Sequence, residues 1–173
     1  MNECIKNMME RRSVRSYSSK QVPDDVLADI LEAGKYAPSG MGRQPCIMVV
    51  IQDKDRISEL SMMNAAVKGS DTDPFYGAPT VIAVFADSTV NTYLEDGSLC
   101  MGNLMNAAHS VGVDSCWIHR AREVFSTPEG RSFMRRWGID EKYVGIGHCI
   151  LGYSDKPIPE AKPRKEGLVV FDD

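Results

Sequence analysis

Three short segments of the chain are apolar almost without interruption, and two of them follow loops rich in Pro and Gly. This pattern predicts buried β-strands at 46–52, 80–86 and 143–151. Apolar positions at helical spacing predict helices over 2–10, 22–35, 57–67, 91–111 and 127–137. The helix over 91–111 is small or apolar around most of its circumference. We therefore expect it to be buried against the rest of the chain or against a second subunit.

The segments between these elements carry turn and boundary signals. Ala37 precedes Pro38 and is pushed toward an extended backbone, so the preceding helix should end there. Residues 68–79 lack periodicity and are typical of a loop. The tail from Ser154 onward contains three prolines, which predicts an extended segment that lies on the surface or reaches a neighbour. Long helical blocks between three strands predict one α+β or three-layer domain spanning residues 1–173.

The composition is that of an ordinary globular protein, with 43% hydrophobic and 25% charged residues. A net charge of −4 argues against non-specific nucleic-acid binding. No window approaches the ~20 apolar residues of a membrane span. The first residues also lack the apolar core of a secretory signal. We therefore expect neither a nucleic-acid nor a membrane partner.

The five cysteines are widely spaced and include no C-x-x-C, which predicts reduced thiols and a cytoplasmic protein. The three histidines lack the spacing of a metal site, so we expect no bound metal. Cys116 could act as a nucleophile only with a base beside it, and the sequence places none there. Most of these thiols are better interpreted as small core hydrophobes.

Positive charge is concentrated at two distant places in this acidic chain. Residues 1–20 carry a net charge of +3, and the short block Lys162–Lys165 adds another +3. Residues 21–119, in contrast, carry a net charge of −8. Two basic segments of this kind can build one anion site from both ends of the chain, although a solvated charged face gives the same pattern.

Three segments could carry chemistry. Arg11, Arg12 and Ser13 offer forked guanidinium donors and a hydroxyl, which suit a phosphate or a flavin carbonyl edge. Cations that decorate a helix C-terminus are the alternative interpretation. The loop 37–45 has prolines near both ends and two glycines that let a ligand approach the backbone, and it also carries an amide at Gln44. Residues 112–119 follow the longest helix and could present backbone N–H groups to a ring system.

Taken in order along nearly the whole chain, these segments resemble the nitroreductase family of FMN-dependent oxidoreductases. RRSVRSY is similar to the family's Arg-Arg-Ser-x-Arg motif, and APSGMGRQP to its Pro-Ser-x-x-Asn-x-Gln-Pro loop. GAPTVIAVFAD resembles its second core strand, and GVDSCWI the segment along its flavin. GIGHCILGY followed by KPR resembles its last strand and phosphate-binding tail. Each motif alone is weak, whereas five in the same order are specific.

The resemblance implies a three-layer α+β sandwich with a mostly antiparallel central sheet. It also implies a domain-exchanged homodimer with FMN at the interface. Gly42 stands where the family usually has Asn, and Cys46 where an aromatic residue commonly follows Gln-Pro. The residues that the resemblance places at the cofactor are Arg11, Arg12, Ser13, Arg15, Pro38, Ser39, Gly40, Gly42, Gln44, Cys116, Trp117, Ile118, Lys162 and Arg164.

The implied activity is a two-step transfer in which NADH or NADPH gives hydride to flavin N5 and a nitroaromatic, quinone or similar small acceptor takes the electrons. No side chain is expected to be catalytic, because the cofactor carries the chemistry. The alternatives are an FMN store or redox sensor without nicotinamide turnover, a reductive dehalogenase or flavin-destroying relative on the same fold, and a structural dimer without flavin. The sequence does not distinguish NADH from NADPH.

Overall fold

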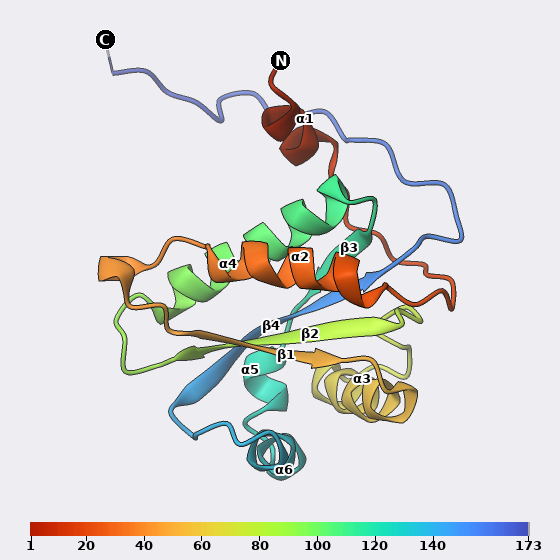
Figure 1. Ribbon diagram of the computed structural model, residues 1–173, viewed down its shortest axis with the longest axis vertical. Helices are drawn as coiled ribbons and strands as arrows, with labels where there is room; N and C mark the ends of the chain where they lie inside the picture. Colours follow the sequence, from red (N-terminus) through yellow and green to blue (C-terminus); the bar gives the residue numbers. More distant parts are fainter. Residues whose placement is uncertain (173) are drawn as a thin grey trace.

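The central layer of the protein is an antiparallel sheet of four strands in the order β1-β2-β4-β3, seen here in a computed structural model that describes residues 1–172. The strands are β1 (Cys46–Ile51), β2 (Thr80–Asp87), β3 (Asp114–Ile118) and β4 (Tyr143–Gly152). One face of the sheet is covered by α2 (Asp24–Lys35) and α4 (Tyr93–Ser110). The other is covered by α3 (Lys54–Lys68), α5 (Ala121–Val124) and α6 (Pro128–Arg136) (Figure 1). The predicted three-layer α+β sandwich is confirmed.

Three of the four strands coincide closely with the predicted apolar runs. All eight residues of β2 are buried, because this strand lies inside the sheet with helices on both faces. β3 was not predicted as a strand. It has only five residues, begins with Asp114 and Ser115, and forms one edge of the sheet. Its polar start hides the apolar pattern that marks the others.

The helices agree with the prediction in number and order, apart from short elements. Pro23 is the N-cap of α2 and not part of the helix. α3 begins earlier than predicted, at Lys54, because the Asp53 side chain accepts a hydrogen bond from the Arg56 backbone N–H. The four-residue α5 and the 3-10 turn η1 (Gly40–Gly42) are too short to give a periodic signal. α1 (Glu3–Glu10) contributes no buried residue.

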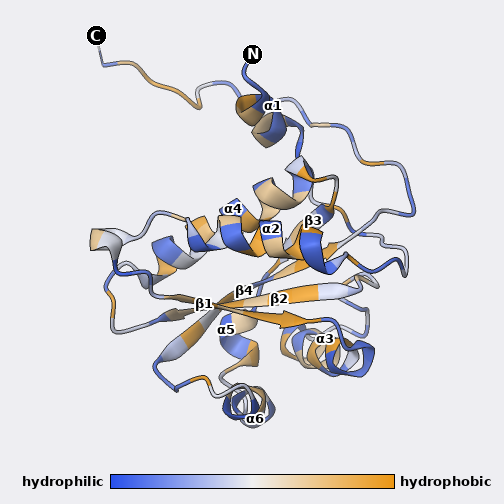
Figure 2. Cartoon of the chain, viewed as in Figure 1, coloured by the Kyte–Doolittle hydropathy of each residue, from blue (hydrophilic) through white to orange (hydrophobic). Residues whose placement is uncertain are grey.

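The sheet separates two apolar cores. Figure 2 shows hydrophobic residues along the strands between the two helical layers. The core under α3, α5 and α6 is built around aromatic side chains, among them Phe75, Phe85 and Phe125. The core under α2 and α4 is aliphatic and sulfur-rich, with Ile82, Met101 and further aliphatic, methionine and cysteine side chains. None of the described helices is long and apolar enough to cross a lipid bilayer.

One face of α4 remains exposed in the single chain, although the sequence is small or apolar around most of the helix. Cys100, Met101 and Leu104 point into the core. Leu99 is 46% exposed, and a methyl group added at Gly102 would meet no atom within 4 Å. Within one chain, therefore, the apolar circumference of α4 is only partly covered.

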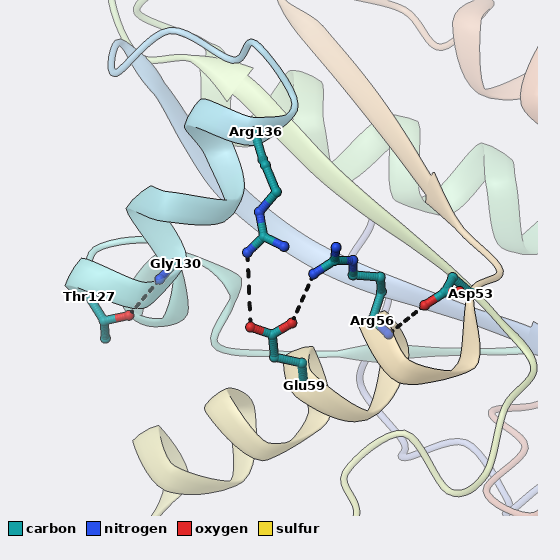
Figure 3. Close-up of polar contacts among 6 residues, drawn as sticks. All are labelled: Asp53, Arg56, Glu59, Thr127, Gly130 and Arg136. Carbon is teal, nitrogen blue, oxygen red and sulfur yellow. Dashed lines mark hydrogen bonds and ion pairs between the residues drawn. The ribbon is translucent and has the colours of Figure 1, made fainter.

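Polar contacts join α3 to α6 below the sheet (Figure 3). The Glu59 carboxylate accepts a hydrogen bond from Arg56 at 3.3 Å and pairs with Arg136 at 4.0 Å. The Thr127 hydroxyl accepts the Gly130 backbone N–H at 3.0 Å and so begins α6. The ion pairs are exposed, and each such pair contributes roughly 0–1 kcal/mol to stability. The aromatic core beneath them is the main source of cohesion in this layer.

The C-terminal tail leaves the body at the β3 edge and is extended, as predicted. The Ser16 hydroxyl donates to Asp155 at 2.5 Å, and the Ser154 backbone N–H donates to Asp114 at 2.8 Å. Beyond these anchors the tail has no helix or strand among residues 155–172 and is exposed, including Val170 at 88%. The tail carries five large apolar residues that are exposed within the chain, namely Ile158, Leu168, Val169, Val170 and Phe171.

Candidate functional site

The first part of the candidate site lies where the segment after α1 runs beside β3. Ser13 and Ser115 form an isolated parallel bridge, in which the Val14 backbone N–H donates to the Ser115 carbonyl at 3.0 Å. The Tyr17 hydroxyl donates to the Val14 carbonyl at 2.9 Å and closes this segment against the core. The structure thereby places Ser13 against the β3 backbone, with Arg11 two residues before it in the chain.

Two polar atoms at this edge are buried without a hydrogen-bond partner. They are Nη1 of Arg11 and the hydroxyl of Ser115. A buried unpaired donor costs free energy comparable to a lost hydrogen bond, so native proteins rarely leave such groups unused. A guanidinium N–H with no protein acceptor suits an anionic or carbonyl oxygen of a ligand. The donor set therefore fits a phosphate or the carbonyl edge of a flavin.

Arg12 behaves differently from Arg11. Its Nη1 donates to the carbonyls of Met9 at 2.7 Å and Arg11 at 2.8 Å, at the C-terminal end of α1. This is the helix-end arrangement that the sequence left open as an alternative. Arg15 is exposed and donates at 3.4 Å to the Ser13 carbonyl. Of the three arginines, Arg11 alone has a buried unpaired nitrogen.

The β3 residues point to opposite faces of the sheet. Cys116 and Ile118 pack into the aromatic core, whereas Trp117 packs against the aliphatic core. Trp117 lies directly over Gly147, where an added methyl group would come within 2.6 Å of the indole nitrogen. The three side chains cannot all line the same ring, because successive residues of a strand alternate between its faces.

The Cys116 thiol is in the wrong environment for a nucleophile. It is 1% exposed, and burial raises its pKa despite the nearby charge of Arg15 and a hydrogen bond from Ser13. A thiol with a raised pKa carries little thiolate near neutral pH. Cys116 is therefore a core residue beneath the site.

The second part of the candidate site is the loop between α2 and β1. The Ser39 hydroxyl accepts the Gln44 backbone N–H at 3.0 Å, and the Ser39 carbonyl accepts the Gly42 N–H at 3.0 Å. Gly42 and two non-glycine residues, Met41 and Gln44, have positive φ values of 65°, 56° and 48°. Left-handed backbone at non-glycine residues is costly and clusters at functional loops.

The buried carboxylate of Asp96 holds this loop on α4. It accepts the Gly40 backbone N–H at 2.9 Å and the Thr92 hydroxyl at 2.9 Å. A methyl group added at Gly40 would come within 2.3 Å of the Thr92 oxygen, so only glycine allows this close approach. Sequence reasoning missed Asp96 and Ser115. An acid inside an apolar helix and a Ser beside Cys116 were the available signals.

The two parts of the site lie at opposite corners of the sheet. Ser115 pairs with Leu151, which pairs with Thr80, whereas Cys46 pairs with Ala86 on the same central strand. Thr80 and Ala86 are about 20 Å apart at roughly 3.3 Å per residue. β3 and β1 are moreover the two outer strands. A single chain therefore does not bring the Arg11 group to the Ser39–Gln44 loop.

The third group of predicted cofactor residues lies in the C-terminal tail. Lys162 and Arg164 are exposed, and Arg164 donates to the Lys162 carbonyl at 3.2 and 2.6 Å. Neither forms an ion pair or a hydrogen bond with residues 11–15 in the part of the chain that the structure describes. The tail runs out from the end of β4 and then back past α1 (Figure 1).

The structure is an α+β sandwich with buried, unpaired polar atoms of Arg11 and Ser115 at one edge of the sheet and a glycine-containing loop at the opposite corner. Residues 8–153 match the Nitroreductase family, and the chain belongs to that family. A solved nitroreductase with bound FMN from Bacteroides fragilis is 30% identical, with a TM-score of 0.92 and complete coverage of both chains.

Two further proteins are similar over most of the chain. A solved nitroreductase with bound FMN from Desulfitobacterium hafniense is 28% identical, with a TM-score of 0.89, over 99% of this chain and 100% of that one. A protein of Archaeoglobus fulgidus, provisionally named NADH dehydrogenase/NAD(P)H nitroreductase, is 31% identical over 172 residues. That match covers 95% of this chain and 94% of the relative.

Proposed function

We propose that the protein is an FMN-dependent oxidoreductase that uses NADH or NADPH to reduce small acceptors such as nitroaromatics and quinones. The observation that carries the proposal is the buried, unpaired Nη1 of Arg11 beside Ser13 and Ser115. Membership of the nitroreductase family and the likeness to two FMN-bound structures support the same cofactor.

Residues of both corners would hold the FMN. Arg11, Ser13 and Arg15 supply positive charge and hydroxyl donors for a phosphate or the pyrimidine edge. The Ser39–Gln44 loop supplies glycine backbone that a planar ring can approach closely, with the Gln44 amide as donor and acceptor. Lys162 and Arg164 add charge that can close over the phosphate from the tail.

When bound, FMN supplies the redox chemistry, taking two electrons as hydride from the nicotinamide and passing them to the acceptor. The residues of the chain bind the FMN and place positive charge beside it. The Arg11 guanidinium favours negative charge on the ring or phosphate beside it. Two candidate side-chain acids or bases are unsuited to proton transfer, because Cys116 and His148 are buried and burial stabilises their neutral forms. This arrangement is expected where the cofactor performs the reaction.

We propose further that the site is completed by a second copy of the chain. The two corners are far apart in one chain, and a two-fold partner can bring the Ser39–Gln44 loop of one copy to the Arg11 group of the other. The exposed face of α4 offers an apolar surface for that partner. The apolar tail residues and the unpaired edge of β1 are suited to exchange between copies, because an extended segment can add to a sheet edge.

The location that we propose is the cytoplasm. Its basis is the cysteine usage, since Cys4, Cys46, Cys100, Cys116 and Cys149 are all free thiols.

The first test is the absorbance spectrum of the purified protein, followed by anaerobic addition of NADH and then NADPH. Flavin bands that bleach with either nucleotide, and recover with a quinone or a nitroaromatic, are the expected result. Bands that neither nucleotide bleaches would contradict turnover and favour a flavin store. Absence of bands after addition of FMN would overturn the cofactor itself.

A further inference from the structure

A cavity of about 180 Å³ lies between the end of α2, the start of β1 and the first half of α4. Its lining includes Ala37, Gln44, Cys46, Met48, Asp96 and Cys100. Two of the five thiols of the protein therefore face one small space at the base of the Ser39–Gln44 loop. The cavity is several times larger than the ~30 Å³ that one molecule occupies in liquid water, so a peroxide can enter it.

The two thiols differ in exposure and in pKa. Cys46 begins β1 and is half-buried, whereas Cys100 lies in α4 and is 1% exposed. The pKa of Cys46 is lowered because Cys100 donates a hydrogen bond toward its sulfur, although burial and the Asp96 carboxylate act in the opposite direction. The same contact, together with burial, raises the pKa of Cys100. The proton therefore stays on Cys100, and Cys46 is the sulfur that becomes a thiolate first.

The other three thiols lack this arrangement. Burial raises the pKa of Cys149 to about 12, and that of Cys116 is also raised by burial. Cys4 is exposed on α1, where the groove between α1 and α4 contains no second cysteine among its lining residues. Cys46 and Cys100, in contrast, both line one cavity, and Cys46 is only half-buried. A half-buried thiol with a resolving thiol beside it is the arrangement of oxidant-sensing cysteines.

We propose that Cys46 and Cys100 form an oxidisable dithiol that hydrogen peroxide converts to a reversible disulfide at the base of the Ser39–Gln44 loop. The Cys46 thiolate attacks one oxygen of the peroxide, the O–O bond breaks, and the departing hydroxide takes a proton to become water. The Cys100 sulfur then attacks the sulfenic sulfur of Cys46, the S–O bond breaks, and a second water leaves with the Cys100 proton. Two electrons pass from the thiols to one peroxide.

The position of this bond gives the oxidation a structural consequence. The disulfide would join Cys46, the first residue of β1, to Cys100 in α4. Cys100 lies one helical turn after Asp96, whose carboxylate accepts a hydrogen bond from the Gly40 backbone N–H. The disulfide would therefore restrict the loop that we assign to the flavin ring. In a reducing compartment such disulfides are transient and sense oxidants, which fits a pair whose outer thiol, Cys46, is half-buried.

The test is intact mass spectrometry of the purified protein, with its natural flavin content, before and after hydrogen peroxide. The expected product has lost the mass of two hydrogens and returns to the starting mass with dithiothreitol. Digestion without reductant should give a disulfide-linked peptide pair that contains Cys46 and Cys100. A mass gain of oxygen atoms on Cys46 with Cys100 still free would overturn the proposal. So would a product in which only Cys4 reacts.

Variants distinguish the role of Cys46, which reacts with peroxide, from that of Cys100, which forms the disulfide. Cys100→Ser should trap Cys46 as a sulfenic acid that dimedone labels, with at least a tenfold greater yield than in the parent protein. Cys46→Ser should lose both the label and the link, whereas the matched control Cys4→Ser should keep the link. If Cys100→Ser does not fold, Cys100→Ala offers a second route. Equal dimedone labelling of Cys46 in the parent and in a folded Cys100 variant would also refute the resolving role of Cys100.

Discussion

The Asp96 carboxylate and the Gly40 backbone N–H, 56 residues apart in the sequence, are joined by a hydrogen bond of 2.9 Å. This contact anchors the Ser39–Gln44 loop to the first turn of α4. The second oxygen of Asp96 accepts the Thr92 hydroxyl, so both oxygens are engaged in a site that is 3% exposed. Asp96 is therefore a positioning residue for the loop.

Replacing Asp96 with Ala should lower the free energy of unfolding by about 2–3 kcal/mol, because a buried charged acceptor is lost and the Gly40 N–H is left unpaired. Asp96→Asn keeps one acceptor and should cost less. Urea unfolding checks both values. Asp29→Ala, an exposed acid on α2, is the matched control. If Asp96→Ala unfolds at the same urea concentration as that control, Asp96 does not anchor the loop.

Arg11→Ala should raise the Kd for FMN by about 10- to 100-fold, since a charge-assisted hydrogen bond contributes roughly 1.5–3 kcal/mol. Arg11→Lys keeps the charge without the forked donors, so its Kd for FMN should lie between those of the parent protein and Arg11→Ala. Quenching of FMN fluorescence on titration with apoprotein measures each Kd. Lys68→Ala at the exposed end of α3 should bind FMN like the parent. An unchanged Kd for Arg11→Ala would remove Arg11 from the cofactor site.

Stability should fall as the pH drops below about 6.5, and His148 should account for part of the loss. Burial lowers the pKa of His148 to about 3, and its Nε2 has no partner. The unfolded chain takes up a proton below its ordinary pKa of roughly 6.5 while the folded chain does not, so each pH unit costs about 1.4 kcal/mol. This contribution to stability is complete above pH 6.5 and is lost between pH 6.5 and 3.

Urea unfolding at pH 7 and pH 5 measures this slope, with an expected difference of about 2 kcal/mol from His148 alone. His148→Gln should reduce the difference by that amount, whatever it does to stability at pH 7. His119→Gln, an exposed histidine on the segment after β3, should keep the parental difference. Equal pH dependence in the parent and in His148→Gln would show that His148 is not held neutral.

Deletion of residues 165–173 should convert a dimer to a monomer, or weaken the dimer at least tenfold, because it removes the exposed apolar end of the tail. Sedimentation velocity over a range of concentrations makes the comparison. A full-length Val170→Asp, Phe171→Asp variant tests the apolar contact without shortening the chain and should behave similarly. A full-length protein that stays monomeric while it binds FMN would contradict a shared site.

Much of the fold could be predicted from local pattern. The run Thr80–Ala86 identified the central strand because both of its faces are covered, and the sequence Thr127-Pro128-Glu129 indicates the cap of α6. The Asp53 cap of α3, in contrast, was missed, so that helix begins earlier than predicted. β3 was missed because its two polar residues at the start resemble a turn. The exposed face of α4 could not be predicted either, since an apolar pattern does not say which molecule covers it.

The candidate site could be predicted residue by residue but not in space. Arg11 and Ser13 could be singled out as candidate ligands because their motif is local, whereas their place beside β3 depends on a long-range contact with Ser115. Their separation from the Ser39–Gln44 loop follows from the strand order β1-β2-β4-β3, which no short segment encodes. The contribution of Asp96 likewise depends on a long-range contact, since its partner Gly40 lies in a loop before β1.

Each chain carries both an uncovered sheet edge at β1 and an apolar tail that could cover such an edge. The presence of both features in every copy has a consequence for assembly. When two copies exchange tails reciprocally, both edges are capped and growth stops. When a tail is instead accepted without being returned, each addition leaves a new free edge, and the same contacts extend into an open polymer. The protein then resists aggregation only when the exchange of tails is reciprocal. One-way exchange is favoured when many unfolded chains meet, as during refolding at high concentration.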